Sequence, residues 1–319
     1  MKPKYYIAAD GGGSKLHAVL YDDRFQIKRR FRTTGVNVLF KPEDEVRKNL
    51  SDMLDRLIGD DVDEIESLDY CLVCKQSLVD QVLATEKRIK RAKRYGEPMI
   101  ALGAALERDG MVALSGTGSD VFMVADGKCL GTVGGWGPLL GDEGSGYDIG
   151  LRAIKAAIYA QDGRGAPTSL LPMVMQHWSC KSLWDVVHVL AGNPDARQEV
   201  ASVAKLASLA AREGDAVALS IYEHAADEQV LMAQTLIKRF LEQWNRRVVL
   251  MGGAWKGCER MVERFCERLA QSYPDVRVLE PIFEPVVGCV VCRCLDEGRS
   301  VEEIRDGLLR GFAELKYQS

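Results

Sequence analysis

Residues 10–15, DGGGSK, join two apolar runs, YYIAA at 5–9 and LHAVLY at 16–21, and this pattern predicts a hairpin of two buried strands. Consecutive glycines let backbone N–H groups converge on an anion, because no Cβ stands in the way. The turn therefore has two interpretations, an ordinary tight hairpin or a phosphate-binding loop. A short motif alone does not separate them.

A second glycine-rich turn repeats the pattern far along the chain. Residues 115–119, SGTGS, lie between MVAL at 111–114 and DVFMV at 120–124, which again gives strand, turn and strand. Neither turn fits a P-loop, which needs Gly-x-x-x-x-Gly-Lys-Ser/Thr at the start of a helix, and neither fits a Rossmann fingerprint. The repeat predicts a duplicated nucleotide-binding fold in which two turns hold one nucleotide.

A longer glycine-rich block, GGWGPLLGDEGSGY at 134–147, follows the second turn. Together with the two turns it resembles the N-acetylglucosamine kinase and BadF/BadG/BcrA/BcrD ATPase group of the actin/hexokinase/Hsp70 superfamily. The resemblance extends to MGGA at 251–254 and to PVVG at 285–288. It implies an α/β fold of two duplicated ribonuclease-H-like, actin-like ATPase domains with an interdomain cleft.

The periodicity of apolar residues divides the chain into two parts. We predict an N-terminal actin-like domain over 1–113 and a larger C-terminal one over 114–319, with helical additions past residue 148. The last helix, about 301–315, is a candidate to pack back on the first domain. At 319 residues with 47% hydrophobic content, the chain is long enough for two cores.

Composition and charge exclude several classes of partner. The net charge of −4 argues against a nucleic-acid partner, and no apolar stretch reaches membrane-spanning length. The N-terminus shows no signal-peptide pattern, so a cytoplasmic location is expected. A basic run at 87–94 is interpreted as a solvated edge strand or loop rather than as a nucleic-acid or acidic-substrate site. A small-molecule substrate fits best.

The resemblance implies ATP and Mg²⁺ as cofactors and names the residues that hold them. Asp10 is the residue expected to position the metal, and the two glycine turns are expected to cradle the phosphates. Glycines of the 251–254 segment are expected to hold adenosine. The predicted cofactor residues are Gly11, Gly12, Gly13, Ser14, Lys15, Gly116, Thr117, Gly118, Gly252 and Gly253.

The catalytic base is predicted to be Glu97. In the resembling kinases an Asp upstream of the SGTGS turn accepts the proton of the attacking sugar hydroxyl, and an ungapped count places Glu97 there. The extra methylene moves the carboxylate oxygens by about 1.5 Å. A displacement of ~1 Å can cost on the order of a hundredfold in rate. The alternative is a surface residue at a strand end before Pro98.

Sugar contacts follow from the same resemblance. Trp136 is expected to supply an apolar plate for the N-acetyl group, or else to be a packing anchor. Asn37 is expected to bind sugar hydroxyls, or else to be a polar turn residue. Asp120 stands where the family has Asn, which keeps an unacetylated amino sugar open. The predicted substrate residues are Asn37, Ser119, Asp120, Gly134, Gly135, Trp136 and Asp142.

These residues and the resemblance together predict an ATP-dependent kinase that phosphorylates a hydroxyl of an amino sugar such as N-acetylglucosamine. The 6-hydroxyl is the expected acceptor. A homodimer is common in the resembling family. One alternative is an ATPase that activates a partner enzyme through an iron–sulfur cluster, and another is a sugar sensor that has lost catalysis. The first would need paired cysteines, but Cys289, Cys292 and Cys294 on a predicted helix are interpreted as buried thiols.

Overall fold

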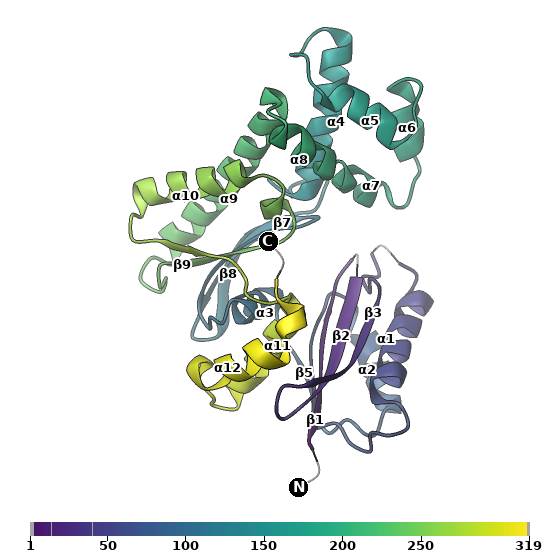
Figure 1. Cartoon of the computed structure of the whole chain (residues 1–319), viewed down its shortest axis with the longest axis vertical. Coiled ribbons are helices and arrows are strands. Elements are labelled where there is room, and N and C mark those ends of the chain that lie inside the picture. The colour runs from purple at the N-terminus through teal and green to yellow at the C-terminus, as the bar shows by residue number, and fades with distance from the viewer. Residues whose placement is uncertain (1–2, 14, 40, 318–319) are drawn as a thin grey trace. The chain divides into compact units, whose positions relative to one another are not determined.

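The computed structural model describes residues 3–13, 15–39 and 41–317, so Ser14, a predicted phosphate ligand, lies outside the described residues. The chain divides into two compact units. The first consists of Met1–Asp109 and Pro281–Ser319, and the second of Gly110–Glu280. Each unit is built on one five-stranded sheet (Figure 1).

The first unit combines a mixed sheet with helices from both ends of the chain. Its strands are β1 (Tyr5–Gly11), β2 (Lys15–Asp22), β3 (Ile27–Thr34), β4 (Ser67–Leu72) and β5 (Ala92–Arg94). Its helices are α1 (Glu43–Ile58), α2 (Gln76–Thr85), α3 (Glu97–Ala104), α11 (Pro285–Asp296) and α12 (Val301–Gly311), followed by the 3₁₀ turn η2 (Ala313–Leu315).

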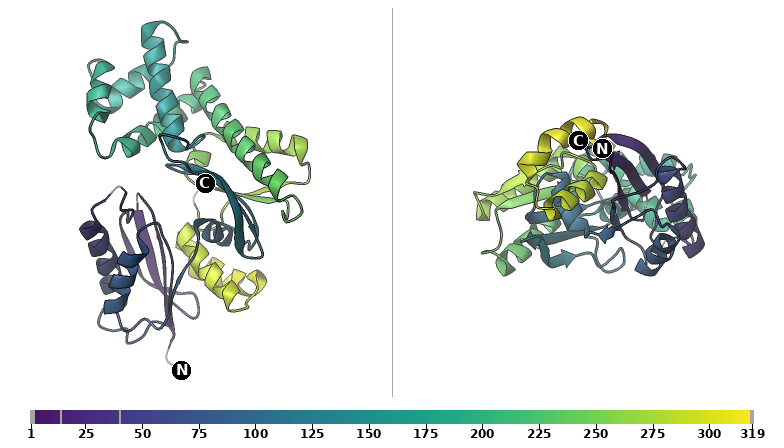
Figure 2. Two further views of the ribbon diagram at one scale, coloured as in Figure 1. Left: turned by 180° about the vertical axis from the view of Figure 1, so that it is seen from behind. Right: turned by 90° about the horizontal axis from the view of Figure 1, so that it is seen from below.

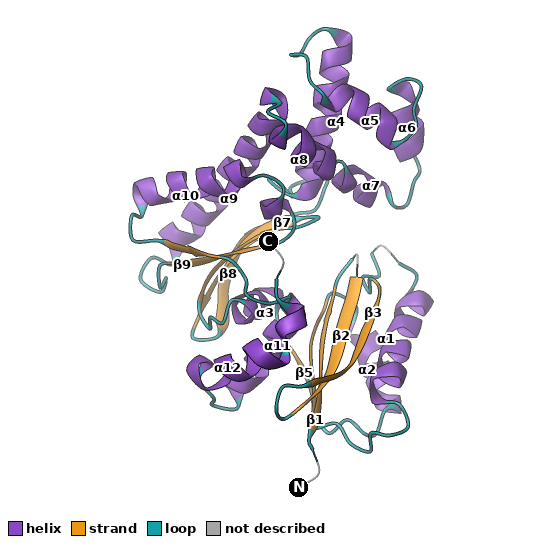
Figure 3. Cartoon of the chain, viewed as in Figure 1, coloured by secondary structure: helices purple, strands orange, loops and turns teal. Residues whose placement is uncertain are grey.

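The second unit is richer in helix, as the purple ribbons of Figure 3 show. Its strands are β6 (Gly110–Ser115), β7 (Ser119–Ala125), β8 (Lys128–Gly134), β9 (Arg247–Met251) and β10 (Arg277–Leu279). Its helices are α4 (Gly146–Asp162), α5 (Leu170–His177), α6 (Trp184–Leu190), α7 (Ala196–Ser202), α8 (Ala204–Arg212), α9 (Ala216–Arg239), the 3₁₀ turn η1 (Ala254–Lys256) and α10 (Glu259–Ser272). None of the described helices is long and apolar enough to cross a membrane.

The two sheets have the same topology. The first has the order β3-β2-β1-β4-β5, and the second has β8-β7-β6-β9-β10 when read from the matching edge. In each, the first three strands along the chain pair antiparallel, and the fourth and fifth add in parallel. The two glycine-rich turns occupy equivalent places, one joining β1 to β2 and the other joining β6 to β7. The predicted duplication is therefore present in the strand order itself.

Alternating residues of β1 place an apolar core on each face of the first sheet. Ile7 and Ala9 pack with the buried side of α1 and α2, whereas Ala8 packs with α11 and α12. Successive strand residues point to opposite faces, so a strand buried on both sides is apolar at every position. The sequence YYIAA meets this requirement.

The unit boundaries differ from the predicted domains of 1–113 and 114–319. The first break falls at Asp109, just before β6 begins, and residues 281–319 belong to the first unit. The reason lies in α11 and α12, whose apolar residues Val286, Val290 and Ile304 are buried in the same core as Ala8. The predicted last helix lies in this unit as well.

Helices α3 and α11 cross at two glycines, and the views of Figure 2 show them side by side although they are far apart in the sequence. A Cβ on Gly288 would lie 1.9 Å from the carbonyl oxygen of Ile100, and one on Gly103 would lie 2.8 Å from that of Gly288. Only glycine permits so close a backbone approach. Gly288 of the PVVG motif therefore fixes the position of α3, whose first residue is Glu97.

The three cysteines of α11 are buried in helix contacts. Cys289 donates to the carbonyl oxygen of Ala9 and Cys292 to that of Met99, both at 3.4 Å. Desolvation raises the pKa of both thiols, so they stay protonated near neutral pH. Among the described residues, no three His, Cys, Asp or Glu side chains form a group that could hold a metal ion. The thiols fill helix contacts, as interpreted from the sequence.

The basic run 87–94 lies at the edge of the first sheet. Its end forms β5, which pairs in parallel with β4. Several of its cations form ion pairs within the unit, with Arg88 on Glu86, Lys90 on Glu64 and Lys93 on Asp296. Surface ion pairs of this kind contribute little stability but do satisfy the charges. The run is a solvated edge, as interpreted from the sequence.

Asp215 caps the N-terminus of α9, the longest described helix, and gives a pH-dependent prediction. Its carboxylate accepts hydrogen bonds from the amides of Val217 and Ala218 at 2.9 and 3.0 Å, and from Thr168 and Ser169. Burial alone would raise its pKa, but these bonds hold the pKa at about 2. The stabilisation is therefore present above the unfolded pKa near 4 and is lost as the pH falls toward 2.

We expect Asp215→Ala to lower the free energy of unfolding by about 1–3 kcal/mol at pH 7, and by less as the pH falls from 4 to 2. Urea unfolding of both proteins across this range measures the difference. The matched control is Asp195→Ala, because Asp195 precedes α7 without a side-chain capping bond. A loss that is the same at pH 7 and pH 2 would contradict the capping explanation.

Candidate active site

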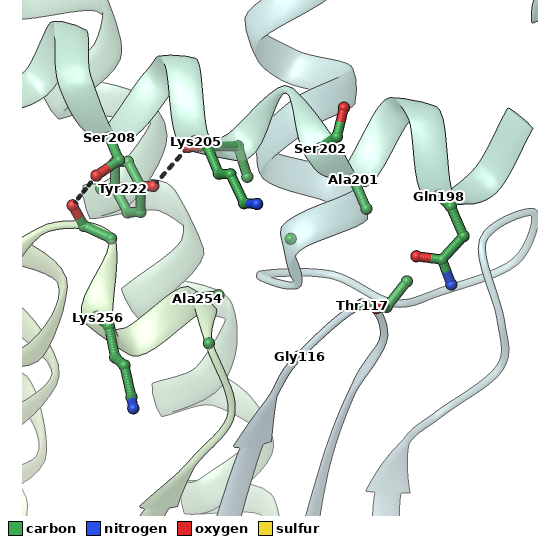
Figure 4. Close-up of a pocket in the computed structure, with 14 residues that line it drawn as sticks. Gly116, Thr117, Gln198, Ala201, Ser202, Lys205, Ser208, Tyr222, Ala254 and Lys256 are labelled. Atoms are coloured by element: carbon green, nitrogen blue, oxygen red, sulfur yellow. Dashed lines mark hydrogen bonds between the residues drawn. The ribbon is translucent and has the colours of Figure 1, made fainter. Parts of the chain in front are cut away.

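A pocket with a volume of about 560 Å³ lies inside the second unit (Figure 4). This volume is in the range of small-molecule and cofactor sites. The turn after β6 closes one end of the pocket with Gly116 and Thr117, and Gln198 of α7 lies beside them in Figure 4. The remaining lining residues are Gly146, Ala201, Ser202, Ala204, Lys205, Ser208, Tyr222, Gly253, Ala254, Lys256 and Gly257.

Side-chain hydrogen bonds fix the walls of this pocket. Ser208 of α8 donates to the carbonyl oxygen of Gly257, and Tyr222 of α9 donates to that of Ala204 at 3.0 Å. The guanidinium of Arg212 donates to the carbonyl oxygen of Lys256 at 3.1 Å. These bonds tie α8 to the segment after β9, so the pocket is preformed. Its lining combines three alanines with polar and charged side chains, which suits a flat ring attached to a polar ligand.

The two glycines of the MGGA segment have different roles. Gly253 lines the pocket, and nothing lies within 4 Å of a Cβ built on it. Gly252 has φ +113°, and a Cβ on it would lie 2.2 Å from the carbonyl oxygen of Ser115. Gly252 therefore lets the end of β9 lie directly against the 115–119 turn, while Gly253 borders the ligand space.

The 115–119 turn and the 142–146 segment of the long glycine block are bonded to each other. Ser115 Oγ donates to the carbonyl oxygen of Gly144 at 2.7 Å, and Ser119 Oγ donates to that of Glu143 at 2.6 Å. The amide of Gly146 donates to the carbonyl oxygen of Gly116 at 2.8 Å. The hydroxyl of Ser119, a predicted substrate residue, is thus used inside the protein.

Asp142, another predicted substrate residue, is buried and paired. Its Oδ2 accepts a hydrogen bond from Nη2 of Arg197 at 2.8 Å, and its Oδ1 lies 3.4 Å from the amide nitrogen of Ser119. Its φ of +60° is rare for a residue other than glycine. Such strain persists where the surroundings impose it, and here the ion pair and the turn do so.

Three further predicted substrate residues lie together at the start of this block. Gly134 is paired with Asp120 in the β7–β8 register, and a Cβ on Gly135 would lie 3.0 Å from Oδ2 of Asp120. The indole of Trp136 is 75% exposed, as are the nearby Leu139 (91%) and Leu140 (76%). These residues expose apolar surface, which favours the sugar plate over the packing anchor for Trp136.

The first unit presents the other glycine turn. The amide of Val36 donates to the carbonyl oxygen of Gly12 at 2.8 Å, and Gly35 packs so closely on Gly13 that a Cβ would lie 2.2 Å from its oxygen. This contact brings Asn37 next to the turn. Its Oδ1 accepts from the amide of Leu39 at 2.9 Å, so Asn37 does serve as a turn residue. Lys15 is exposed at the start of β2.

Asp10 lies at the end of β1 among other charged groups of the first unit. Its pKa is raised to about 7, chiefly by burial and to a smaller degree by the carboxylates of Glu97 and Glu284, against the lowering effect of Lys15. A buried carboxylate whose charge Lys15 compensates only in part suits a bound cation. Mg²⁺ takes one or two carboxylates together with phosphate oxygens and water, so Asp10 fits such an ion without further protein ligands.

Glu97 is the first residue of α3 rather than a strand end, and its neighbour Pro98 occupies the first turn of that helix. Its side chain reaches the surface, yet desolvation by the atoms around it raises its pKa. A general base acts best when its pKa lies nearer the working pH than an ordinary carboxylate does. The direction of this shift is the one that such a role requires.

Several pocket residues were not predicted from the sequence. They are Gln198, Ala201, Ser202, Lys205, Ser208, Tyr222 and Lys256. They lie on helices whose sequence shows only ordinary amphipathic spacing, and no motif marks them. Arg197 likewise gave no signal, because its partner Asp142 is distant in the sequence.

Filling the pocket gives a direct test of what binds there. We expect Ala201→Phe to weaken ADP binding by at least about tenfold, because the phenyl ring would occupy part of the cavity next to Gln198. Calorimetric titration measures the affinity. The control is Ala216→Phe at the exposed first residue of α9. Unchanged ADP affinity in Ala201→Phe would place the nucleotide elsewhere.

A protein-family model and two characterised kinases match this chain over most of its length. A model of the BadF/BadG/BcrA/BcrD ATPase family matches residues 9–292. The chain is 28% identical over 303 residues to the N-acetylmuramic acid/N-acetylglucosamine kinase of Clostridium acetobutylicum, covering 90% of this chain and 97% of the relative. It is 25% identical over 319 residues to the N-acetyl-D-glucosamine kinase of Dictyostelium discoideum, covering 91% and 98%.

A solved structure is similar over nearly its whole length. It is a candidate N-acetylglucosamine kinase from Porphyromonas gingivalis, with a TM-score of 0.73 at 17% identity, covering 92% of this chain and 99% of that one. At this identity the likeness shows the fold alone. Together with the repeated sheet topology, it confirms the predicted duplicated α/β fold of the actin-like ATPase type.

Proposed function

Because the chain belongs to the BadF/BadG/BcrA/BcrD ATPase family, we propose that it is an ATP-dependent kinase that phosphorylates a hydroxyl of an amino sugar. The observation that carries this proposal is the pair of curated amino-sugar kinases that align with this chain over nearly their whole length. The preformed pocket beside a glycine turn supports ATP as the donor. The thiols of Cys289 and Cys292 are buried in contacts with Ala9 and Met99 and give no support to the iron–sulfur activator.

The nucleotide is expected to place its adenosine in the 560 Å³ pocket, beside Gly253, with its phosphates toward Gly116 and Thr117. Gly118 completes this turn, and Gly11, Gly12, Gly13 and Lys15 of the other turn are proposed to complete the phosphate site. Backbone amides at glycines and a lysine ammonium neutralise phosphate oxygens. Mg²⁺ held at Asp10 would neutralise the charge that develops on the transferring phosphoryl group.

Glu97 is proposed to accept the proton of the attacking hydroxyl. Phosphoryl transfer needs mainly alignment and charge neutralisation. The main task of the base is therefore to orient the hydroxyl oxygen toward the phosphorus. We place the transfer at the 6-hydroxyl, because this primary oxygen can rotate toward both the base and the phosphorus. Its proton moves to Glu97 as the new O–P bond forms and ADP leaves.

The sugar is proposed to be held by Asn37, Asp120 and the backbone of Gly134 and Gly135, with its N-acetyl group on the exposed Trp136. The carboxylate of Asp120 accepts hydrogen bonds from sugar hydroxyls or from a free amine. Its acceptor-only character keeps glucosamine among the substrates to be tested. A homodimer remains a prediction of the resemblance, and a cytoplasmic location remains a prediction from the sequence.

The proposal is tested by ATP-dependent phosphorylation of N-acetylglucosamine, glucosamine, N-acetylmuramate, N-acetylmannosamine and glucose. We expect turnover of at least one amino sugar and little of glucose. Nuclear magnetic resonance of the product assigns the phosphorylated oxygen. Tight sugar binding without turnover would indicate a sensor, and hydrolysis of ATP that no sugar stimulates would refute the kinase.

A further inference from the structure

One ion pair of the second unit lies directly behind the 115–119 turn. Arg197 of α7 donates from Nη2 to Oδ2 of Asp142 at 2.8 Å. The Asp142 side chain is 3% exposed and that of Arg197 22%. A buried carboxylate keeps its charge only where a partner compensates for lost hydration. Arg197 supplies that compensation.

The turn packs on this pair at Gly118. A Cβ on Gly118 would lie 2.8 Å from Nη2 of Arg197 and 2.8 Å from Oδ1 of Asp142. The backbone of Gly118 thus lies close to both charged groups, with no room for a side chain between them. The net charge of Arg197 and Asp142 therefore acts at short range on any anion that the turn binds.

The same helix also forms a wall of the nucleotide pocket. Gln198, which follows Arg197 in α7, lines the pocket, as do Ala201 and Ser202. Figure 4 shows Gln198 next to Thr117 of the turn. The ion pair therefore lies where the pocket wall, the turn and the 142–146 segment meet.

We propose that Arg197 is a positioning residue for the nucleotide phosphates, acting through Asp142. By neutralising the buried carboxylate under Gly118, it removes a negative charge that would repel the phosphates, and it holds the turn in its binding conformation. This inference rests on the proposed function, in which the 115–119 turn takes the phosphates of ATP. Such a residue touches no reacting atom, and its effect is on phosphate affinity.

The decisive comparison is between ADP, which carries phosphates, and adenosine, which does not. We expect Arg197→Ala to weaken ADP binding at least tenfold and adenosine binding less than twofold, because only the phosphates meet the exposed charge. Arg197→Lys should recover part of the loss. The double variant Asp142→Asn with Arg197→Gln carries neither charge and should restore ADP affinity to within about threefold of the wild type.

Both ligands are titrated by calorimetry, and thermal unfolding is followed for each variant. The control is Arg164→Ala, which removes an exposed arginine that pairs with Asp162 in the same unit. Unchanged ADP affinity in Arg197→Ala, an equal loss for ADP and adenosine, or a double variant as weak as the single one would each overturn the proposal. Since no sugar is present, a failure of the kinase assay is a separate result that concerns the proposed function alone.

Discussion

Replacing Glu97 by glutamine is expected to lower kcat for sugar phosphorylation by about 10²–10⁴-fold, the range for loss of a general base. The amide keeps the size of the side chain at the start of α3 but cannot accept the proton of the hydroxyl. Nucleotide affinity should change much less than kcat, because Glu97 is proposed to act on the sugar hydroxyl and not to bind the nucleotide. Steady-state kinetics and ADP titration measure the two quantities.

The pH profile of the wild type gives a second test of the same residue. Desolvation raises the pKa of Glu97, so the ionised base is lost at a higher pH than an ordinary glutamate would lose its charge. The rate should therefore rise with pH on the acid side and level off above the raised pKa. In Glu97→Gln this acid limb should disappear from the residual activity.

Glu97→Asp is the matched control. It keeps the carboxylate but withdraws its oxygens by about 1.5 Å, so an intermediate loss on the order of a hundredfold is expected. If Glu97→Gln kept wild-type kcat, the base would be another group or the hydroxyl would need none. If Glu97→Asp were faster than the wild type, the sugar would bind in the position that suits the shorter Asp of the resembling kinases.

The hairpin that opens each sheet could be predicted from the sequence because it depends on local patterns. Apolar runs on both sides of the turns at 10–15 and 115–119 specify hairpins, and their repetition specifies two similar sheets. The last helix, about 301–315, was predicted to pack back on the first domain, but the place of residues 281–300 was not, since it depends on which core buries Val286. That choice is made by packing over a long sequence distance, which no local pattern records.

The candidate site divides in the same way. Gly116 was predicted because a turn near a phosphate needs residues without a Cβ, and Gly253 was predicted from the family resemblance. Lys205 and Gln198 were not, because a polar residue on a helix is ordinary until the fold places it at a pocket. Ser119 and Asp142 carry the polar atoms expected of ligands, yet the structure shows those atoms in bonds that join the turn to the 142–146 segment.

The substitution Gly252→Ala is expected to have the second large effect, on both stability and ADP binding. A Cβ there would lie 2.2 Å from the carbonyl oxygen of Ser115 and 2.8 Å from the amide nitrogen of Gly116, and φ is +113°. Backbone atoms cannot rotate away as a side chain can, so Gly252→Ala must move the end of β9 away from the 115–119 turn. The strained φ alone costs on the order of 1–3 kcal/mol. The displaced turn should weaken ADP binding on the order of a hundredfold, with kcat falling in parallel.

Gly253→Ala is the matched control for Gly252→Ala. The two glycines are neighbours in the same segment, but a Cβ on Gly253 meets nothing within 4 Å. Gly253→Ala should therefore unfold within about 0.5 kcal/mol of the wild type. Urea unfolding and ADP titration of both variants separate the alternatives. Equal behaviour of the two would mean that β9 and the turn adjust independently, so that the pocket does not depend on the contact at Gly252. A loss confined to Gly252→Ala would show that the adenosine segment and the phosphate turn are held together by one backbone contact, which only glycine permits.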